Sequence, residues 1–252
     1  MILVLSIILF FLLLFVGGKR GIKIFFTIYF NLAMIFVFII MVGLGFNPII
    51  QAFIISLIIS FIILFLLNGV SKKTISSFIS IFIILIVFIF IIILFSKRIY
   101  MHGYSEETIA AVNYINYNCG VNMLDLFNAM IIIGLIGSII DTSIAISSAL
   151  YEVYINNNDL KINELFKSGM NIGKDIMGTT VNTLFFAFLG GYMSLIIYFF
   201  DKDIDLVSII NTRVFACEIS RIVICGIASF LIIPLTSIIT SLIIKRTDDL
   251  TD

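Results

Sequence analysis

The chain has 252 residues, of which 62% are hydrophobic and 12% are charged, and its mean hydropathy is +1.25. Soluble domains are about half apolar and a quarter charged, so an ordinary soluble globule and a disordered chain are excluded. Lys+Arg and Asp+Glu number 15 each, which leaves no net positive charge for binding a nucleic acid. The composition predicts an all-α, polytopic transmembrane helix bundle that forms a single membrane domain.

Seven hydrophobic runs approach or exceed the roughly 20 residues that a membrane-spanning helix needs. They are Ile2–Val16, Phe25–Phe46, Ile49–Leu67, Ile75–Phe95, Leu124–Ile155, Ile176–Phe200 and Phe215–Ile244. Residues 1–95 thus hold four apolar spans, 96–123 a polar connection, 124–246 three spans with polar stripes, and 247–252 a tail. We expect Pro234 to break or kink the last span, because proline lacks a backbone N–H.

The Lys and Arg residues are divided unevenly among the connections. Ten belong to the odd-numbered connections and the tail, and four belong to the even-numbered ones. The positive-inside rule therefore predicts an outside N-terminus, a cytoplasmic C-terminus and an extracytoplasmic connection at 96–123. Lys19 and Arg20 follow the first span instead of preceding it, which favours an uncleaved anchor over a cleaved signal peptide, although cleavage remains an alternative.

The chain has few residues that could perform chemistry. His102 is the only histidine, so we expect no metal centre and no Ser/His pair within the membrane. No phosphate-binding glycine loop is present either, and we predict a protein that is not an enzyme and has no cofactor. Cys119 and Cys217 are both expected near the outer face, which leaves a disulfide between them open, whereas Cys225 should be buried.

The first four spans have only a few polar residues, none of them ionisable. Such helices typically shield a functional bundle or form an interface with another subunit. Their polar residues include Asn31, Gln51, Ser56, Ser60 and Ser80.

The fifth span has a stripe of small and polar residues that share one helical face. Their spacing of three and four residues predicts a close approach to another helix. The stripe consists of Gly134, Gly137, Ser138, Asp141, Ala145, Ser148 and Glu152. Asp141 lies near the middle of the span, where an ionised carboxylate costs roughly 2.5–3.5 kcal/mol or more. It is therefore either a tie between helices or part of a site for a substrate, an ion or a proton.

The sixth span repeats this pattern with Asp175, Gly178, Thr179, Asn182 and Gly190 on one face. Asn182 should lie deeper in the membrane than Asp175, by about 10 Å. If the two stripes face each other, they form a polar track in the cytoplasmic half of the membrane. The predicted pathway residues are Asp141, Ser138, Ser148, Glu152, Asp175, Thr179 and Asn182.

Two further features flank the sixth span. The pattern of residues Asp159–Gly173 predicts a short amphipathic helix on the membrane surface, with Asp159 as its N-cap. At the start of the seventh span, Glu218 and Arg221 are three residues apart and can form an ion pair.

Several of these segments together resemble the YibE/F family of bacterial membrane proteins, and the length is similar to its shorter, YibF-like members. The resemblance covers roughly Gly103–Ser241, and the first four spans match only as hydrophobic helices. The similar segments are Gly103–Tyr104, Gly134–Asp141 continuing to Glu152, Glu164–Thr179, Val181–Leu184, Gly190, Glu218–Arg221 and Ile233–Thr236. The resemblance implies a companion subunit of the longer, YibE-like kind as a partner, and it supplies no substrate.

Two functions remain in competition. Asp141, the polar stripes and Pro234 favour a transporter or channel component in the bacterial cell membrane that acts on a small solute or ion. The featureless first half favours a membrane scaffold or accessory subunit, acting as a homo-oligomer or with the companion subunit.

Overall fold

The protein is all-helical in its described residues, which are 1–99, 122–157, 160–201, 207–208 and 211–248 of a computed structural model. Its long helices are α1 (Ile2–Gly43), α2 (Pro48–Asn68), α3 (Lys72–Ile99), α5 (Met123–Asn156), α6 (Ile162–Asp201) and α8 (Arg213–Asp248). Five of them, α1, α2, α3, α5 and α8, are long and apolar enough to cross a membrane. The sixth predicted span lies within α6, and the total of seven spans stays a prediction.

The first two predicted spans form one helix with a sharp bend. A straight helix of 42 residues would be about 63 Å long, twice the roughly 30 Å of a hydrocarbon core. Gly18 interrupts it with φ 52° and ψ −131°, a conformation that suits glycine. The chain folds back here, and Gly21 lies so close to the backbone of Leu13 that it has no room for a side chain. The two arms also meet through a hydrogen bond between the hydroxyls of Ser6 and Tyr29.

Two later helices begin at an asparagine cap. The Asn47 side chain accepts hydrogen bonds from the backbone of Ile49 (3.0 Å) and Ile50 (3.2 Å) before α2. The Asn122 side chain accepts one from Leu124 (3.0 Å) before α5. These bonds satisfy backbone N–H groups that have no partner within the helix.

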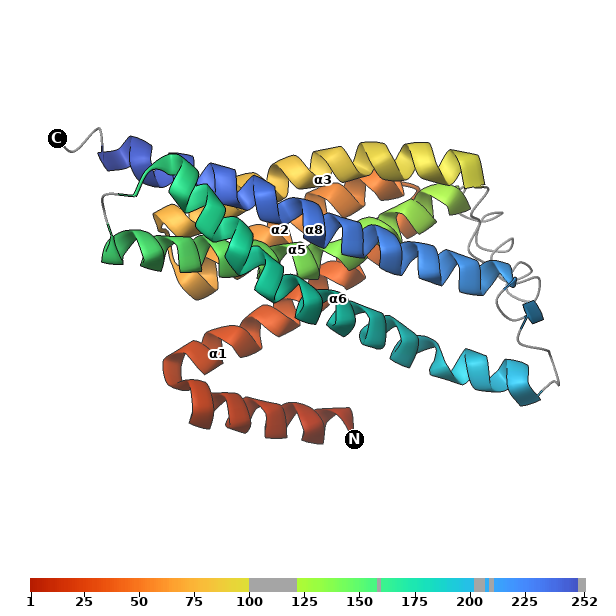
Figure 1. The fold of residues 1–252 in the computed structure, drawn as a ribbon. Helices are drawn as coiled ribbons and strands as arrows, with labels where there is room; N and C mark the ends of the chain where they lie inside the picture. Colours follow the sequence, from red (N-terminus) through yellow and green to blue (C-terminus); the bar gives the residue numbers. More distant parts are fainter. Residues whose placement is uncertain (100–121, 158–159, 202–206, 209–210, 249–252) are drawn as a thin grey trace.

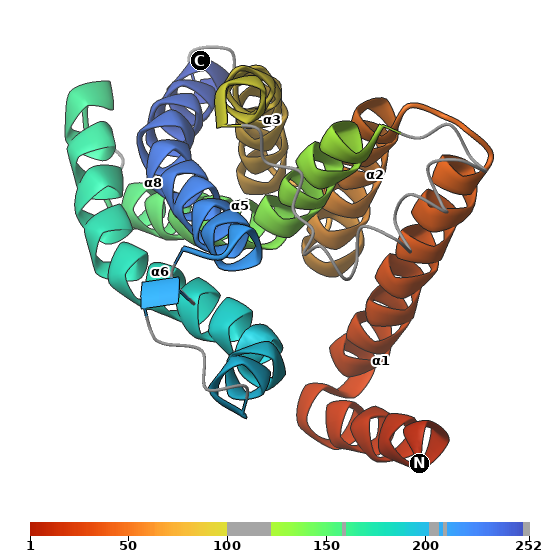
Figure 2. The same cartoon turned by 90° about the vertical axis from the view of Figure 1, so that its right-hand side faces the viewer.

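Helices α2, α3, α5 and α8 pack into a central bundle, and α1 and α6 lie on opposite flanks of it (Figure 2). α1 packs mainly against α2, whereas α6 crosses α8 and α5 obliquely (Figure 1). The largest cluster of buried apolar side chains joins α2, α3, α5 and α8. α5 is therefore surrounded by protein over most of its circumference, as the sequence indicates.

Two sequence predictions about helix boundaries are wrong. α8 continues through Pro234, so the expected break is wrong, whereas a kink at this residue stays a prediction. The expected surface helix at 159–173 is not separate either, because α6 is continuous from Ile162 to Asp201. Its N-terminal part packs against α8, and Asp159, the predicted cap, lies outside the described residues.

Candidate functional site

The site is built on one side of α5, the helix at the centre of the bundle. Gly137 and Asp141 are exposed on this side, whereas the neighbouring Ile139, Ile140 and Thr142 are buried. Asp141 thus points away from the apolar interior although it lies near the middle of a 34-residue helix.

α6 crosses α5 and contacts it on either side of Asp141 along the helix. Near one end, Leu150 lies against Gly169, at 3.0 Å from the position that a Cβ atom on this glycine would occupy. Towards the other end, the ring of Phe188 lies 3.8 Å from the corresponding position at Gly134. Asp141 lies between these two contacts on α5, and Thr179 and Asn182 lie between them on α6. The fold therefore brings these three residues into the same stretch of the helix pair.

No described side chain forms a hydrogen bond or ion pair with the Asp141 carboxylate. Thr179 and Asn182 are exposed as well, and the Thr179 hydroxyl donates to the carbonyl of Ile176 in its own helix (2.7 Å). A carboxylate exposed to lipid at this depth would be costly. The site therefore needs water, a bound cation, a proton or another protein chain beside Asp141.

The remaining predicted pathway residues do not form a continuous track inside the single chain. Ser138 is buried and donates to the carbonyl of Leu135 (3.0 Å), and Ser148 is half-buried. Glu152 is exposed near the end of α5, and Asp175 is exposed within α6. The polar side of α6 faces away from Gly169 and Gly173, which contact α8, so it is not enclosed between α5 and α6.

A cluster of buried hydroxyls joins α3, α5 and α8, and the sequence analysis did not anticipate it. The hydroxyls of Ser77 and Ser147 are 2.7 Å apart, and Ser77 also donates to the carbonyl of Ser143 (3.2 Å). The hydroxyl of Ser143 is 3.1 Å from that of Thr236 on α8. The paired polar residues Ser76–Ser77, Thr236–Ser237 and Thr240–Ser241 were the available signal in the sequence. Hydrogen bonds of this kind typically add about 0.6 kcal/mol each to helix association in a membrane.

The predicted pair of Glu218 and Arg221 is present at the start of α8. The guanidinium of Arg221 also lies over the ring of Phe188 on α6, 4.6 Å from its centroid. This group therefore ties α8 to α6 next to the point where α6 meets Gly134 of α5.

Two predictions about metal and sulfur chemistry concern other parts of the chain. Within the described residues, no three His, Cys, Asp or Glu side chains lie close enough to hold a metal ion. Cys225 is buried, as expected, and so is Cys217. Cys119 and His102 lie outside the described residues, so the possibility of a disulfide between Cys119 and Cys217 stays open.

Comparison with known proteins adds one finding. The sequence model of the family described as YibE/F-like protein matches residues 5–246. This match extends the resemblance from Gly103–Ser241 to nearly the whole chain, including the four apolar spans at the N-terminal end. No curated protein and no solved structure matches the chain.

Proposed function

The chain belongs to the YibE/F-like family, and from this premise we propose that it is a component of a transporter or channel in the bacterial cell membrane. Its long apolar helices indicate an integral membrane protein. In this proposal it moves a small solute or an ion and catalyses no reaction. Asp141, Thr179 and Asn182 lie on the pathway in this proposal.

One observation carries the proposal: Asp141 is an ionisable residue halfway along an apolar helix, and it has no partner among the described residues. Ionisable residues at this depth usually face a bundle interior or a water-filled cavity. A helix tie would need a partner side chain on a neighbouring helix, and none in the described part of the chain contacts the carboxylate. This favours the pathway over the tie.

Water access to position 141 tests the pathway directly. Asp141→Cys, in a background with the native cysteines replaced, should react in membranes with a charged, membrane-impermeant thiosulfonate. Phe230→Cys is the matched control, because Phe230 is also exposed near the middle of a spanning helix but has apolar neighbours. We expect position 141 to react at least about tenfold faster than position 230. Equal, slow reaction at both positions would contradict a water-filled pathway.

A second measurement tests whether the carboxylate itself is needed. In proteoliposomes under an imposed membrane potential, we expect proton or Na⁺ flux that Asp141→Asn abolishes. Asp125→Asn, at the first turn of the same helix, should retain the flux. Full flux through a well-folded Asp141→Asn protein would remove Asp141 from the pathway, because asparagine keeps the volume and the hydrogen bonding but cannot ionise.

An accessory or scaffold subunit is the second candidate, supported by the exposure of the polar sides of α5 and α6 in the single chain. A companion subunit of the YibE-like kind, or a second copy, would then cover Asp141. Coexpression with a companion would slow labelling at position 141 in this arrangement. Unchanged labelling would leave the pathway as the better explanation.

A further inference from the structure

A pocket of about 720 Å³ lies between α1 and α2, away from Asp141. Five of its eight lining side chains are aromatic, namely Phe26, Tyr29, Phe30, Phe61 and Phe65, and the Tyr29 hydroxyl is hydrogen-bonded to that of Ser6. Thr27 also lines the pocket, but its hydroxyl donates to the carbonyl of Lys23 (2.8 Å) and is already satisfied. The pocket therefore offers an apolar, aromatic surface with little capacity for hydrogen bonding.

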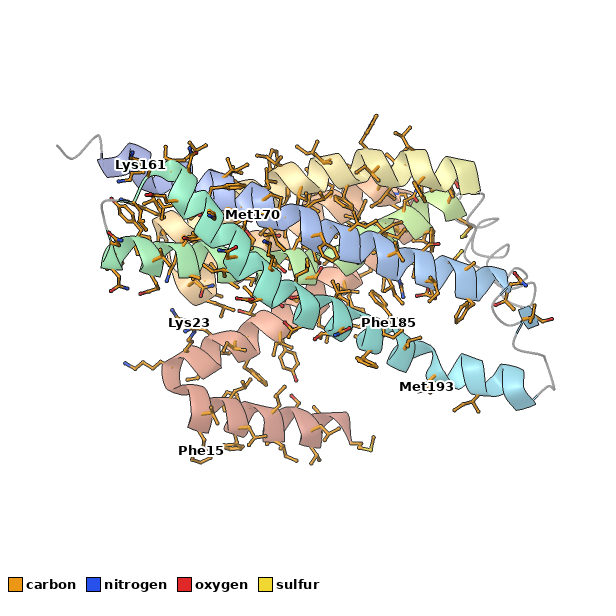
Figure 3. All side chains as sticks on the ribbon, viewed as in Figure 1. Phe15, Lys23, Lys161, Met170, Phe185 and Met193 are labelled. Atoms are coloured by element: carbon orange, nitrogen blue, oxygen red, sulfur yellow. The ribbon has the colours of Figure 1, made fainter. Side chains whose placement is uncertain are left out.

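Basic residues lie at one end of this pocket, beside the bend of α1. The guanidinium of Arg20 donates to the side chain of Asn68 at the end of α2 (3.1 Å), which brings its charge to within two residues of Leu66 in the pocket wall. Lys23 lies beside the end of α2 (Figure 3). Lys19 and Lys23 are exposed, and neither has an ion-pair partner among the described residues.

The charges and the aromatic wall follow each other along both helices. On α1, Lys19, Lys23, Phe26 and Phe30 are four, three and four residues apart, so they share one face. Phe30 lies about 10 Å beyond Lys23, and on α2 Phe61 lies about 10 Å from Asn68 by the same rise per residue. Each helix thus presents a polar or charged group at the end of the pocket and aromatic rings over the next 10 Å or so of membrane depth.

We infer that this pocket binds an anionic phospholipid, with an acyl chain against the phenylalanines and the headgroup phosphate at Lys19, Arg20 and Lys23. Basic sites between helices on the cytoplasmic side are a recurrent form of lipid headgroup recognition. A free phosphate would use the cations and leave the aromatic wall without an occupant. A neutral lipid would fill the wall and leave the three positive charges without a counterion.

The chain has no tryptophan, so the fluorescence of a single introduced tryptophan reports on its own position alone. Phe26→Trp introduces a single fluorophore into the pocket, and Phe186→Trp on α6 introduces one outside it. The two positions are similarly exposed, at 63% and 68%. Both proteins are reconstituted in phosphatidylcholine vesicles that contain a minor fraction of phosphatidylglycerol, with either lipid brominated on its acyl chains to quench tryptophan.

We expect brominated phosphatidylglycerol to quench Phe26→Trp with an apparent affinity at least about fivefold above that of brominated phosphatidylcholine. This is the effect of one basic residue near an anionic lipid, about 1 kcal/mol. Phe186→Trp should show no preference. High salt should weaken the preference at Phe26→Trp, because it screens exposed charges, and millimolar inorganic phosphate should not remove it.

Charge removal separates a headgroup site from general attraction to a basic membrane face. The preference should disappear in Phe26→Trp carrying Lys19→Gln, Arg20→Gln and Lys23→Gln. It should also weaken in the double variant Lys19→Gln/Lys23→Gln, which keeps the bond between Arg20 and Asn68. Lys161→Gln/Lys167→Gln/Lys174→Gln removes as many charges from the α6 segment and should leave the preference intact. Equal quenching by both lipids at Phe26→Trp, or a preference that survives the first triple variant, would overturn the inference. Displacement by inorganic phosphate alone would do the same.

Discussion

The ion pair of Glu218 and Arg221 lies in surroundings that make the loss of either partner costly. Both side chains are only 12% exposed, and Arg221 also contacts the Phe188 ring of α6. An exposed pair three residues apart is worth only a few tenths of a kcal/mol. Removing one partner from a largely buried pair costs more, because the other charge remains in a poorly solvated place.

We expect Glu218→Gln and Arg221→Gln each to destabilise the protein and the double variant to lose less than the sum. The coupling energy should lie between about 0.5 and 3 kcal/mol. Thermal unfolding of the four proteins in detergent measures it. Strictly additive losses would show that the two charges act independently.

At the scale of a helix, α6 depends on two glycines for its close approach to α8. A Cβ atom at Gly169 would lie 2.5 Å from the Ser237 hydroxyl oxygen, and one at Gly173 would overlap the side chain of Ile233. Gly178, further along α6, is exposed, and a Cβ atom there would have no neighbouring atom within 4 Å. The same residue type therefore serves packing at two positions and not at the third.

Gly173→Ala should destabilise the protein by about 1–3 kcal/mol, the usual cost of overpacking. Gly178→Ala should be neutral or slightly stabilising, because alanine favours the helix where space allows it. The unfolding temperatures of the two variants check this contrast. Equal effects at both positions would mean that α6 does not rest on α8 through these glycines.

The helices were predictable from apolar run length, and the caps at Asn47 and Asn122 follow from residue type. The polar stripe of α5 was also readable, because its spacing places Gly137 and Asp141 on one side. The continuity of α6 could not be predicted from the sequence, because its amphipathic N-terminal part has the pattern of a surface helix. Only the contacts of Gly169 and Gly173 show that this part packs against α8. The pairing of Ser143 with Thr236 depends on helix neighbours, which periodicity within one helix does not reveal.

Over the whole molecule, most of the basic residues lie at one end of the bundle. The bend of α1, the turn between α2 and α3, the end of α5 with the start of α6, and the end of α8 all lie at the same end of the bundle (Figure 1). The turn between α1 and α2 lies at the other end. Successive connections between the helices therefore alternate between the two ends of the bundle, as the comparison of odd- and even-numbered connections assumes. The assignment of the basic end to the cytoplasm is a prediction.

Cysteine labelling in intact cells tests that assignment. In a background with the native cysteines replaced, Leu44→Cys should react with a membrane-impermeant maleimide from outside. Val70→Cys, similarly exposed in the opposite turn, should react only after permeabilisation. The reverse result would place the basic end, and with it the bend of α1, outside the cell.

The packing of α8 against both α3 and α5 affects the order in which the bundle assembles during biosynthesis. Spanning helices enter the membrane before they pack against one another, and α8 leaves the ribosome after every other helix described. Until then, the Ser143 hydroxyl has only the carbonyl of Ser77, and the Ser76 hydroxyl has only the carbonyl of Lys73 in its own helix. Thr236 and Thr240 add their hydroxyls to these two serines when α8 arrives. α2, α3 and α5 thus form an incomplete assembly in the bilayer until α8, the last of the described helices, completes it.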